Sequence, residues 1–142
     1  MNDSMKAVRI VVGVDGSPSS VNALREGARL AAELNGTVDA IAVWSAPTKQ
    51  ASYEAVGIGS FSEGATQVMD TALLEAFDGG SPAVVRARVE QGSAAAVLVE
   101  ASKDARYVVV GRRGHGGLMG VLLGSVSSHT INHAHCPVIV VR

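Results

Sequence analysis

The feature that most constrains the fold is a series of short aliphatic runs spread along the chain. Residues 7–15 read AVRIVVGVD, residues 37–44 read TVDAIAVW, and residues 106–111 read RYVVVG. The last run, residues 136–142, reads CPVIVVR. Short runs rich in Val and Ile are typical of parallel strands that are buried on both faces. With aromatic residues at only 4%, such aliphatic strands must build the core.

A fifth run differs from the other four. Residues 83–90 read AVVRARVE, so valine alternates with arginine. Alternation of this kind predicts a strand with one solvated face, and we expect it at an edge of the sheet.

Helical patterns lie between these runs. Ser17 and Pro18 predict the start of the first helix, with Ser17 as N-cap and Pro18 at the first helical position. Asn35 and Gly36 predict its end. Further helices are expected at residues 63–77, 94–102 and 122–134. Residues 46–62 are polar and carry glycines and a proline, which predicts a loop; its length is typical of a functional or mobile segment.

The alternation of strands and helices predicts the fold class. It indicates an α/β fold with a doubly wound five-stranded parallel sheet and helices on both faces. Right-handed crossovers restrict the order of the strands. No internal repeat or second domain is indicated, so we expect a single domain over residues 1–142.

Charge and composition exclude several classes of protein. The chain has 12 Lys and Arg against 13 Asp and Glu and a net charge of -1, without the basic excess of nucleic-acid-binding domains. Cys136 is the one cysteine, which excludes a disulfide scaffold; we expect it to be a small buried apolar residue. No signal-peptide pattern or apolar run of membrane-spanning length is present. We therefore expect a cytoplasmic protein with no nucleic-acid or membrane partner.

The ends of two strands indicate where a ligand would bind. In open parallel sheets, ligands bind beyond the carboxyl ends of the strands, where the winding direction reverses. Asp15 follows the first strand and Gly111 follows the fourth. In a doubly wound sheet these strands are neighbours, so we expect Asp15 and Gly111 to face each other across a crevice.

Residues 111–125, GRRGHGGLMGVLLGS, point to a phosphorylated ligand. Glycines allow backbone N–H groups to approach an anion closely, and Gly124 and Ser125 lie near the start of a predicted helix, whose end favours phosphate. Candidate phosphate donors nearby are Arg112, Arg113 and His115. Asp15 could accept from ribose hydroxyls or reach a metal ion. The sequence has neither a Walker motif nor a Gly-x-Gly-x-x-Gly after the first strand.

Plainer interpretations of the same residues remain open. The glycine run could be a flexible turn, Asp15 could cap the first helix or satisfy a turn, and the two arginines could be solvated. His129 and His133 have the spacing of a helical metal-ligand pair, but no third ligand is near in sequence. We therefore predict no metal site in the protein itself.

Three segments together resemble the universal stress protein family, and the similarity covers the whole chain. They read VVGVDGSPSS, VVVGRRGHGG and LLGSVSSHTINHAHCPVIVV. Gly111 and Gly114 are separated by two residues, and nine more precede Gly124 and Ser125. This spacing resembles the signature of the ATP-binding subgroup. The resemblance implies an adenine nucleotide alpha hydrolase-like fold with strand order 3-2-1-4-5, and ATP as ligand with Mg²⁺ as its candidate companion.

The resemblance also implies roles for individual residues. Val14 and Asp15 match adenine and ribose contacts, Val43 an adenine wall, and Val110 and Gly111 the floor of the site. The positions that match the phosphate- and ribose-binding loop are Gly114, Gly124, Ser125, Val126 and Ser127. Family members commonly dimerise through the last strand, here Pro137 to Arg142, so we expect a homodimer.

The expected function is nucleotide-dependent regulation in a stress response. Phosphoryl transfer requires a metal and a residue that orients the nucleophile, and Asp15 is the one carboxylate that the sequence places at the site. Two alternatives remain. One is a slow ATPase or autophosphorylating protein that uses Ser125 or Ser127, and the other is an interaction module with a vestigial nucleotide site.

Overall fold

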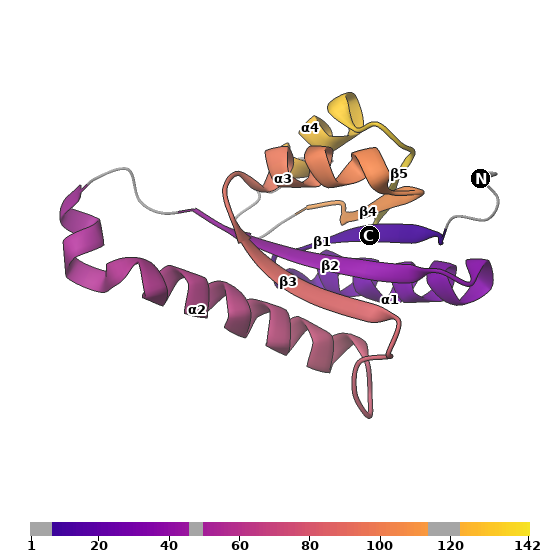
Figure 1. Ribbon diagram of the computed structural model, residues 1–142, viewed down its shortest axis with the longest axis horizontal. Helices are drawn as coiled ribbons and strands as arrows, with labels where there is room; N and C mark the ends of the chain where they lie inside the picture. Colours follow the sequence, from indigo (N-terminus) through magenta and orange to yellow (C-terminus); the bar gives the residue numbers. More distant parts are fainter. Residues whose placement is uncertain (1–6, 46–49, 114–122) are drawn as a thin grey trace.

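The protein is a three-layer α/β structure with one sheet between two layers of helices (Figure 1). The computed structural model describes residues 7–45, 50–113 and 123–142, with the backbone alone from 50 to 60. All neighbouring strands are parallel, and their order is β3-β2-β1-β4-β5. The predicted fold class and strand order are therefore confirmed. The strands are β1 (Arg9–Val14), β2 (Thr37–Trp44), β3 (Val85–Gln91), β4 (Tyr107–Gly111) and β5 (Val138–Val141).

The helices divide between the two faces of the sheet. Figure 1 shows α1 and α2 on one face and α3 and α4 on the other. A helix follows each of the first four strands, because parallel neighbours need a crossover connection. The helices are α1 (Pro18–Leu34), α2 (Gln50–Ala76), α3 (Ala94–Ala101), which continues as a short 3-10 turn, η2 (Ser102–Asp104), and α4 (Ser125–His133).

Strand β1 is buried on both faces and separates two apolar clusters. Ile10 and Val12 belong to the cluster that includes Leu24 of α1. Val11, between them, belongs to the cluster that includes Leu98 of α3. All five of these side chains are at most 2% exposed. The aliphatic run that predicts this strand is thus explained by burial on both sides of a parallel sheet.

The ends of α1 lie where the sequence predicts them. The Ser17 hydroxyl accepts a hydrogen bond from the Ser20 amide at 3.2 Å, and Pro18 is the first helical residue. Asn35 ends the helix in the left-handed conformation, with φ 55°, and its amide donates to the Ala31 carbonyl. A serine N-cap followed by proline fixes where the chain turns from β1 into α1.

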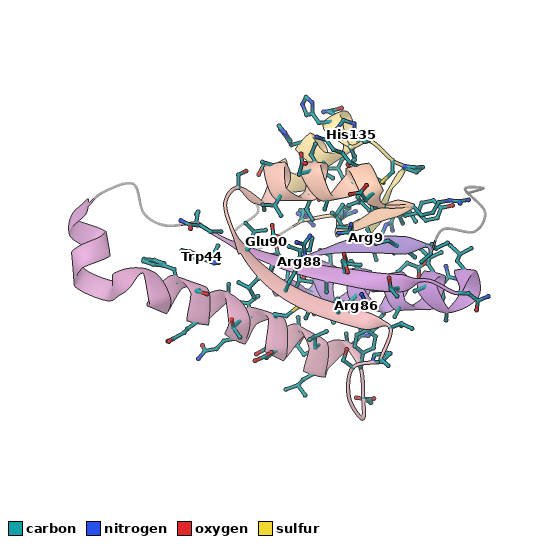
Figure 2. All side chains as sticks on the ribbon, viewed as in Figure 1. Arg9, Trp44, Arg86, Arg88, Glu90 and His135 are labelled. Carbon is teal, nitrogen blue, oxygen red and sulfur yellow. The ribbon has the colours of Figure 1, made fainter. Side chains whose placement is uncertain are left out.

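The arginine-rich strand β3 is an edge strand, as its alternation predicts. Figure 2 shows Arg9, Arg88 and Glu90 on the side of the sheet that carries α3. Arg88 pairs with Glu90, and Arg9 pairs with Asp39. Within the part of the chain that the structure describes, this end of the sheet is covered by charged side chains on one face and by α2 on the other.

The prediction of a loop over residues 46–62 was wrong for residues 50–62. Helix α2 begins at Gln50 and runs to Ala76, whereas the sequence predicts a helix only from residue 63. Figure 1 shows the first turns of α2 extending past the carboxyl ends of the strands. A helix segment that does not pack on the sheet needs no apolar stripe, so the pattern that identifies helices is absent there. Residues 46–49 lie outside the described residues.

Two smaller boundaries also differ from those predicted. Helix α4 spans Ser125–His133 instead of residues 122–134, of which residue 122 lies outside the described ranges. Strand β5 spans Val138–Val141, shorter at both ends than the aliphatic run. Pro137 stands directly before the strand, a position that its missing N–H permits.

We predict that Gly36→Ala destabilises the fold. A Cβ on Gly36 would lie 2.4 Å from the Val8 carbonyl oxygen. That oxygen accepts from the Thr37 amide at 2.8 Å where β1 and β2 begin to pair. The clash is with backbone, so the strand ends must separate, and we expect the free energy of unfolding to fall by about 1–3 kcal/mol in urea titrations.

The matched control is Gly64→Ala in α2. A Cβ on Gly64 would meet no atom within 4 Å, so alanine should raise stability by up to about 1 kcal/mol through its helix propensity. Equal unfolding midpoints for Gly36→Ala and the wild-type protein would contradict the close approach at Gly36.

Candidate functional site

The described residues form a cavity at the carboxyl ends of the central strands. Strands β1 and β4 are neighbours, and the chain leaves them toward opposite faces, into α1 after β1 and toward α4 after β4. The cavity has a volume of ≈ 240 Å³, somewhat below the roughly 300 Å³ at which the usual range for small-molecule sites begins. It is lined by Gly13, Val14, Asp15, Ser17, Ser20, Ile41, Val43, Ala94, Leu98, Val110, Gly111, Arg113, Gly124, Ser125, Val126 and Ser127.

One part of the cavity wall is apolar. Ile41, Leu98 and Val110 belong to one buried cluster, against which Val43 packs. Gly13 lies beside them: a Cβ there would be 2.9 Å from Leu98 Cδ1. Three strands and α3 therefore present aliphatic groups and a bare backbone toward one space. Such a wall suits a flat apolar group such as an aromatic ring.

The turn between β1 and α1 supplies polar groups. The Asp15 carboxylate accepts from the Ser17 amide at 2.9 Å, which orients the side chain at the mouth of the cavity. Gly16 between them has φ 84°, a conformation that favours glycine. The side chain of Ser17 caps α1 while lining the cavity. Asp15 thus takes part in the turn, the plainer of its predicted roles, and also faces the cavity.

The segment that leaves β4 is tied to the start of α4. The Gly124 amide donates to the Arg112 carbonyl at 2.8 Å, and the Arg112 amide donates to the Val141 carbonyl of β5 at 2.6 Å. The Ser127 hydroxyl donates to the Gly111 carbonyl at 2.5 Å. These bonds bring the two ends of the glycine-rich segment together at one side of the cavity.

Helix α4 begins at this point without a side-chain cap. Gly124 is its N-cap, and among the described residues no side-chain hydrogen bond caps the helix. The first backbone bond of the helix runs from the Ser128 amide to the Gly124 carbonyl. Earlier amides of the turn therefore lack partners within the helix, and they carry the positive end of its dipole. Anions bind readily in such positions.

The structure gathers most of the residues that the sequence singles out. Every predicted nucleotide contact within the described residues lines the cavity, as does Arg113. Arg112 does not line it and contributes to the base of the glycine-rich segment through its backbone. Gly114 and His115 lie outside the described residues. Whether the gathered residues bind a nucleotide remains a prediction.

The sequence analysis missed several lining residues. They are Gly13, Ser17, Ser20, Ile41, Ala94 and Leu98. Ala94 and Leu98 are four positions apart on α3 and thus share a helix face. Their placement directly after the third strand was the available signal, since segments that follow strands line the crevice in such folds.

No group of three or more His, Cys, Asp or Glu residues in the described ranges could hold a metal ion. The His129 and His133 rings lie 4.3 Å apart on α4. Among the described residues, no helix combines the length and apolarity required to cross a membrane.

Cys136 packs against the cluster on the α3 side of the sheet. Its side chain is partly buried, and this burial raises the pKa of the thiol. Desolvation disfavours the thiolate, so Cys136 behaves as a small apolar residue more than as a nucleophile.

Comparison with known proteins identifies the family. The model of the universal stress protein family matches residues 7–142. The chain belongs to the universal stress protein family. Among curated relatives, a universal stress protein of Mycobacterium tuberculosis is 33% identical over 153 aligned positions, which cover 100% of this chain and 50% of the relative. One of Mycolicibacterium smegmatis is 36% identical, over 94% of this chain and 45% of the relative. The chain thus spans about half the length of these relatives.

Solved universal stress proteins share the fold. UspA from Lactobacillus plantarum superposes with a TM-score of 0.79 at 22% identity, over 96% of this chain and 99% of that one. A universal stress protein in complex with cAMP superposes with a TM-score of 0.61 at 25% identity, over 96% and 97% of the two chains. The fold is the adenine nucleotide alpha hydrolase-like fold of the family.

We predict that Ser127→Ala destabilises the protein before any ligand is considered. Ser127 is 4% exposed, and its hydroxyl donates to the Gly111 carbonyl. Removing the donor leaves that carbonyl without this bond, so the free energy of unfolding should fall by about 1–3 kcal/mol. Chemical denaturation measures the change.

Ser128→Ala is the matched control for this experiment. Ser128 is the next residue of α4 and is only partly buried, so alanine there should change stability by less than about 0.5 kcal/mol. If the two variants unfolded at the same denaturant concentration, the buried hydrogen bond of Ser127 would not contribute to stability.

Proposed function

We propose that this universal stress protein binds an adenine nucleotide, ATP foremost, in the cavity between β1 and β4, and that binding regulates its role in a stress response. The observation that carries the proposal is the pairing of two unlike surfaces in one cavity. One part of the cavity is an aliphatic wall in which Gly13 contributes only backbone atoms. Another part is the start of α4, where the N-cap residue is a glycine. A nucleotide has the same division between an apolar ring and an anionic tail.

The lining residues suggest an orientation for the ligand. The base would lie against Ile41, Leu98 and Val110, and the Asp15 carboxylate would accept hydrogen bonds from ribose hydroxyls. The phosphates would extend toward Arg113 and the first turn of α4, where amides and a guanidinium offer donors. The cavity volume of ≈ 240 Å³ suits the nucleoside, with the phosphates leading out of it. Mg²⁺ would arrive with ATP, bound to its phosphates.

Two solved relatives support an adenine nucleotide as the ligand class. A universal stress protein that is 25% identical to this chain was solved in complex with cAMP. Another, from Archaeoglobus fulgidus and 20% identical, was solved with dAMP. ATP is proposed because of the spacing of Gly111, Gly114 and Gly124-Ser125, which resembles that of the ATP-binding subgroup.

A regulatory role fits the lining better than catalysis does. Asp15 is the one carboxylate among the residues described as lining the cavity. It already accepts from the Ser17 amide, and phosphoryl transfer needs a group that positions a nucleophile as well as metal ligands. We therefore propose that ATP acts through conformation or partner choice.

Self-phosphorylation is the second candidate function, and we propose Ser125 as its acceptor because Ser127 is buried. Ser127 is buried and its hydroxyl donates to a carbonyl. Ser125 is exposed and lines the cavity at the first residue of α4. Incubation with γ-labelled ATP that modified Ser125, followed by loss of the label in Ser125→Ala, would favour this candidate over regulation by binding alone.

We predict a thermal shift with ATP. At a hundred times its dissociation constant, ATP with Mg²⁺ should stabilise nucleotide-free protein by about 2.7 kcal/mol. For a chain of this length, the melting temperature should rise by about 5–10 °C in scanning fluorimetry. If no shift appeared up to millimolar ATP, the proposed function would be wrong.

Ser125→Asp sharpens this experiment. A carboxylate at the first residue of α4 is favourable for the helix dipole, so the ligand-free melting temperature should hold or rise. The same charge repels phosphate, so the shift with ATP should be lost. Thr71→Asp adds the same charge at an exposed position of α2 away from the cavity, and it should keep the full shift.

We also propose a homodimer through β5. This strand is aliphatic and forms the edge of the sheet opposite β3, and exposed apolar edges pair readily. The Pro137 and Val141 carbonyls accept from the Val108 and Arg112 amides of the β4 segment. Backbone N–H and C=O groups alternate in direction from one residue of a strand to the next. The N–H and C=O groups of Val138 and Val140 therefore face away from β4, toward a second chain in the proposed dimer.

Val140→Pro tests this dimer. Proline removes an amide that faces outward and leaves the bonds to β4 intact, so the variant should fold but fail to pair. Multi-angle light scattering should give a dimer mass for the wild-type protein and a monomer mass for the variant. A wild-type monomer at micromolar concentration would overturn the dimer proposal.

A further inference from the structure

We infer that Ser19 of α1 is a positioning residue for the nucleotide site. Its hydroxyl holds the Arg113 carbonyl and so fixes the direction in which the glycine-rich segment leaves β4. Ser19 is not among the residues that line the cavity, so its effect would act through the backbone of Arg113. This inference rests on the proposed nucleotide binding for its functional consequence, while the hydrogen bond itself can be tested without any ligand.

The contact joins two parts of the chain that are distant in sequence. Ser19 Oγ donates to the Arg113 carbonyl at 2.7 Å across 94 positions. Ser19 is only partly buried, and it is the second residue of α1, directly after Pro18. Its hydroxyl is not the cap of the helix, because Ser17 bonds to the Ser20 amide. The Ser19 hydroxyl also lies 3.5 Å from Ser17 Oγ, and its shorter bond to the Arg113 carbonyl directs it toward the continuation of β4.

Gly111 makes this contact possible. A Cβ on Gly111 would lie 2.3 Å from Ser19 Oγ and 2.8 Å from the Ser19 carbonyl carbon. No side chain larger than hydrogen fits there unless the first turn of α1 moves. The glycine at the end of β4 thus admits α1 as a close neighbour, a role beyond the approach to a ligand that the sequence suggests.

The carbonyl groups of the last residue of β4 and of the two residues after it each accept a hydrogen bond from a different donor. The Gly111 carbonyl accepts from Ser127 of α4, the Arg112 carbonyl from the Gly124 amide, and the Arg113 carbonyl from Ser19 of α1. A carbonyl oxygen is the negative end of its peptide dipole and repels phosphate. Engaging all three with protein donors keeps these oxygens from turning toward an anion in the cavity.

Loss of the Ser19 hydroxyl should have two measurable effects. The Arg113 carbonyl would lose its hydrogen-bond donor. Because the lost bond is a neutral one, the affinity for ATP should fall about two- to tenfold. Trypsin cleaves after arginine and must itself bind the carbonyl of the cleaved bond. Cleavage after Arg113 should therefore be faster in the variant than in the wild-type protein.

The experiment compares Ser19→Ala, Ser19→Thr and the control Ser128→Ala in full-length, nucleotide-free protein. Calorimetric titration with Mg²⁺–ATP gives the affinities, and timed trypsin digestion with mass spectrometry gives the cleavage rate after Arg113. We expect weaker binding and faster cleavage for Ser19→Ala only, with threonine restoring both because it keeps the hydroxyl.

The outcomes separate this inference from the proposed function. Unchanged cleavage after Arg113 in Ser19→Ala would overturn the inference, as would threonine behaving like alanine in both measurements. If the wild-type protein bound no ATP, the proposed function would fail. Faster cleavage in Ser19→Ala alone would then still support the positioning of Arg113 by Ser19.

Discussion

Parallel pairing of β1 with β4 is the interaction on which the site depends. It brings the turn at Asp15 beside the end of β4 at Gly111, although the two lie far apart in sequence. The pairing requires β1 to be covered on both faces, and Ile10, Val11 and Val12 supply aliphatic groups alternately to the two sides. A polar residue in this run would lose burial on one face and loosen the crevice formed where the two strands end.

Much of this architecture is predictable from local sequence. The aliphatic runs identify the strands, and Ser17, Pro18 and Asn35 mark the ends of α1, because burial on both faces and helix capping act on residues close in sequence. The same holds for the meeting of Asp15 with Gly111, which follows from the topology of doubly wound sheets. The residues that the family resemblance adds, from Val14 to Ser127, lie around one cavity wherever the structure describes them.

What the sequence could not provide depends on tertiary contacts or on their absence. The first turns of α2 have no sheet beneath them, so residues 50–62 carry no periodic pattern and suggested a loop. Leu98 enters the site because Gly13 leaves room for it. The bond from Ser19 to Arg113 spans 94 positions, and a serine in the first turn of a helix is common enough to attract no notice.

Several serines around the site have structural functions. In the sequence alone, the same serines could be taken for catalytic or ligand-binding residues. Ser17 caps α1, Ser20 donates to the Ser17 carbonyl, and Ser127 donates to the Gly111 carbonyl. Within the described part of the chain, no buried side-chain nitrogen or oxygen atom lacks a hydrogen-bond partner. A hydroxyl beside this cavity is therefore weak evidence for chemistry unless, like that of Ser125, it belongs to an exposed residue.

The two edges of the sheet have opposite character. Arg86, Arg88 and Glu90 of β3 place charges along one edge, whereas β5 presents only valine and isoleucine at the other. Charged edge strands resist the addition of a further strand. A pair joined at β5 would thus form a continuous sheet whose two outer boundaries are both β3. Growth by strand addition would stop at two chains, and the asymmetry would protect an otherwise aliphatic sheet from fibre formation.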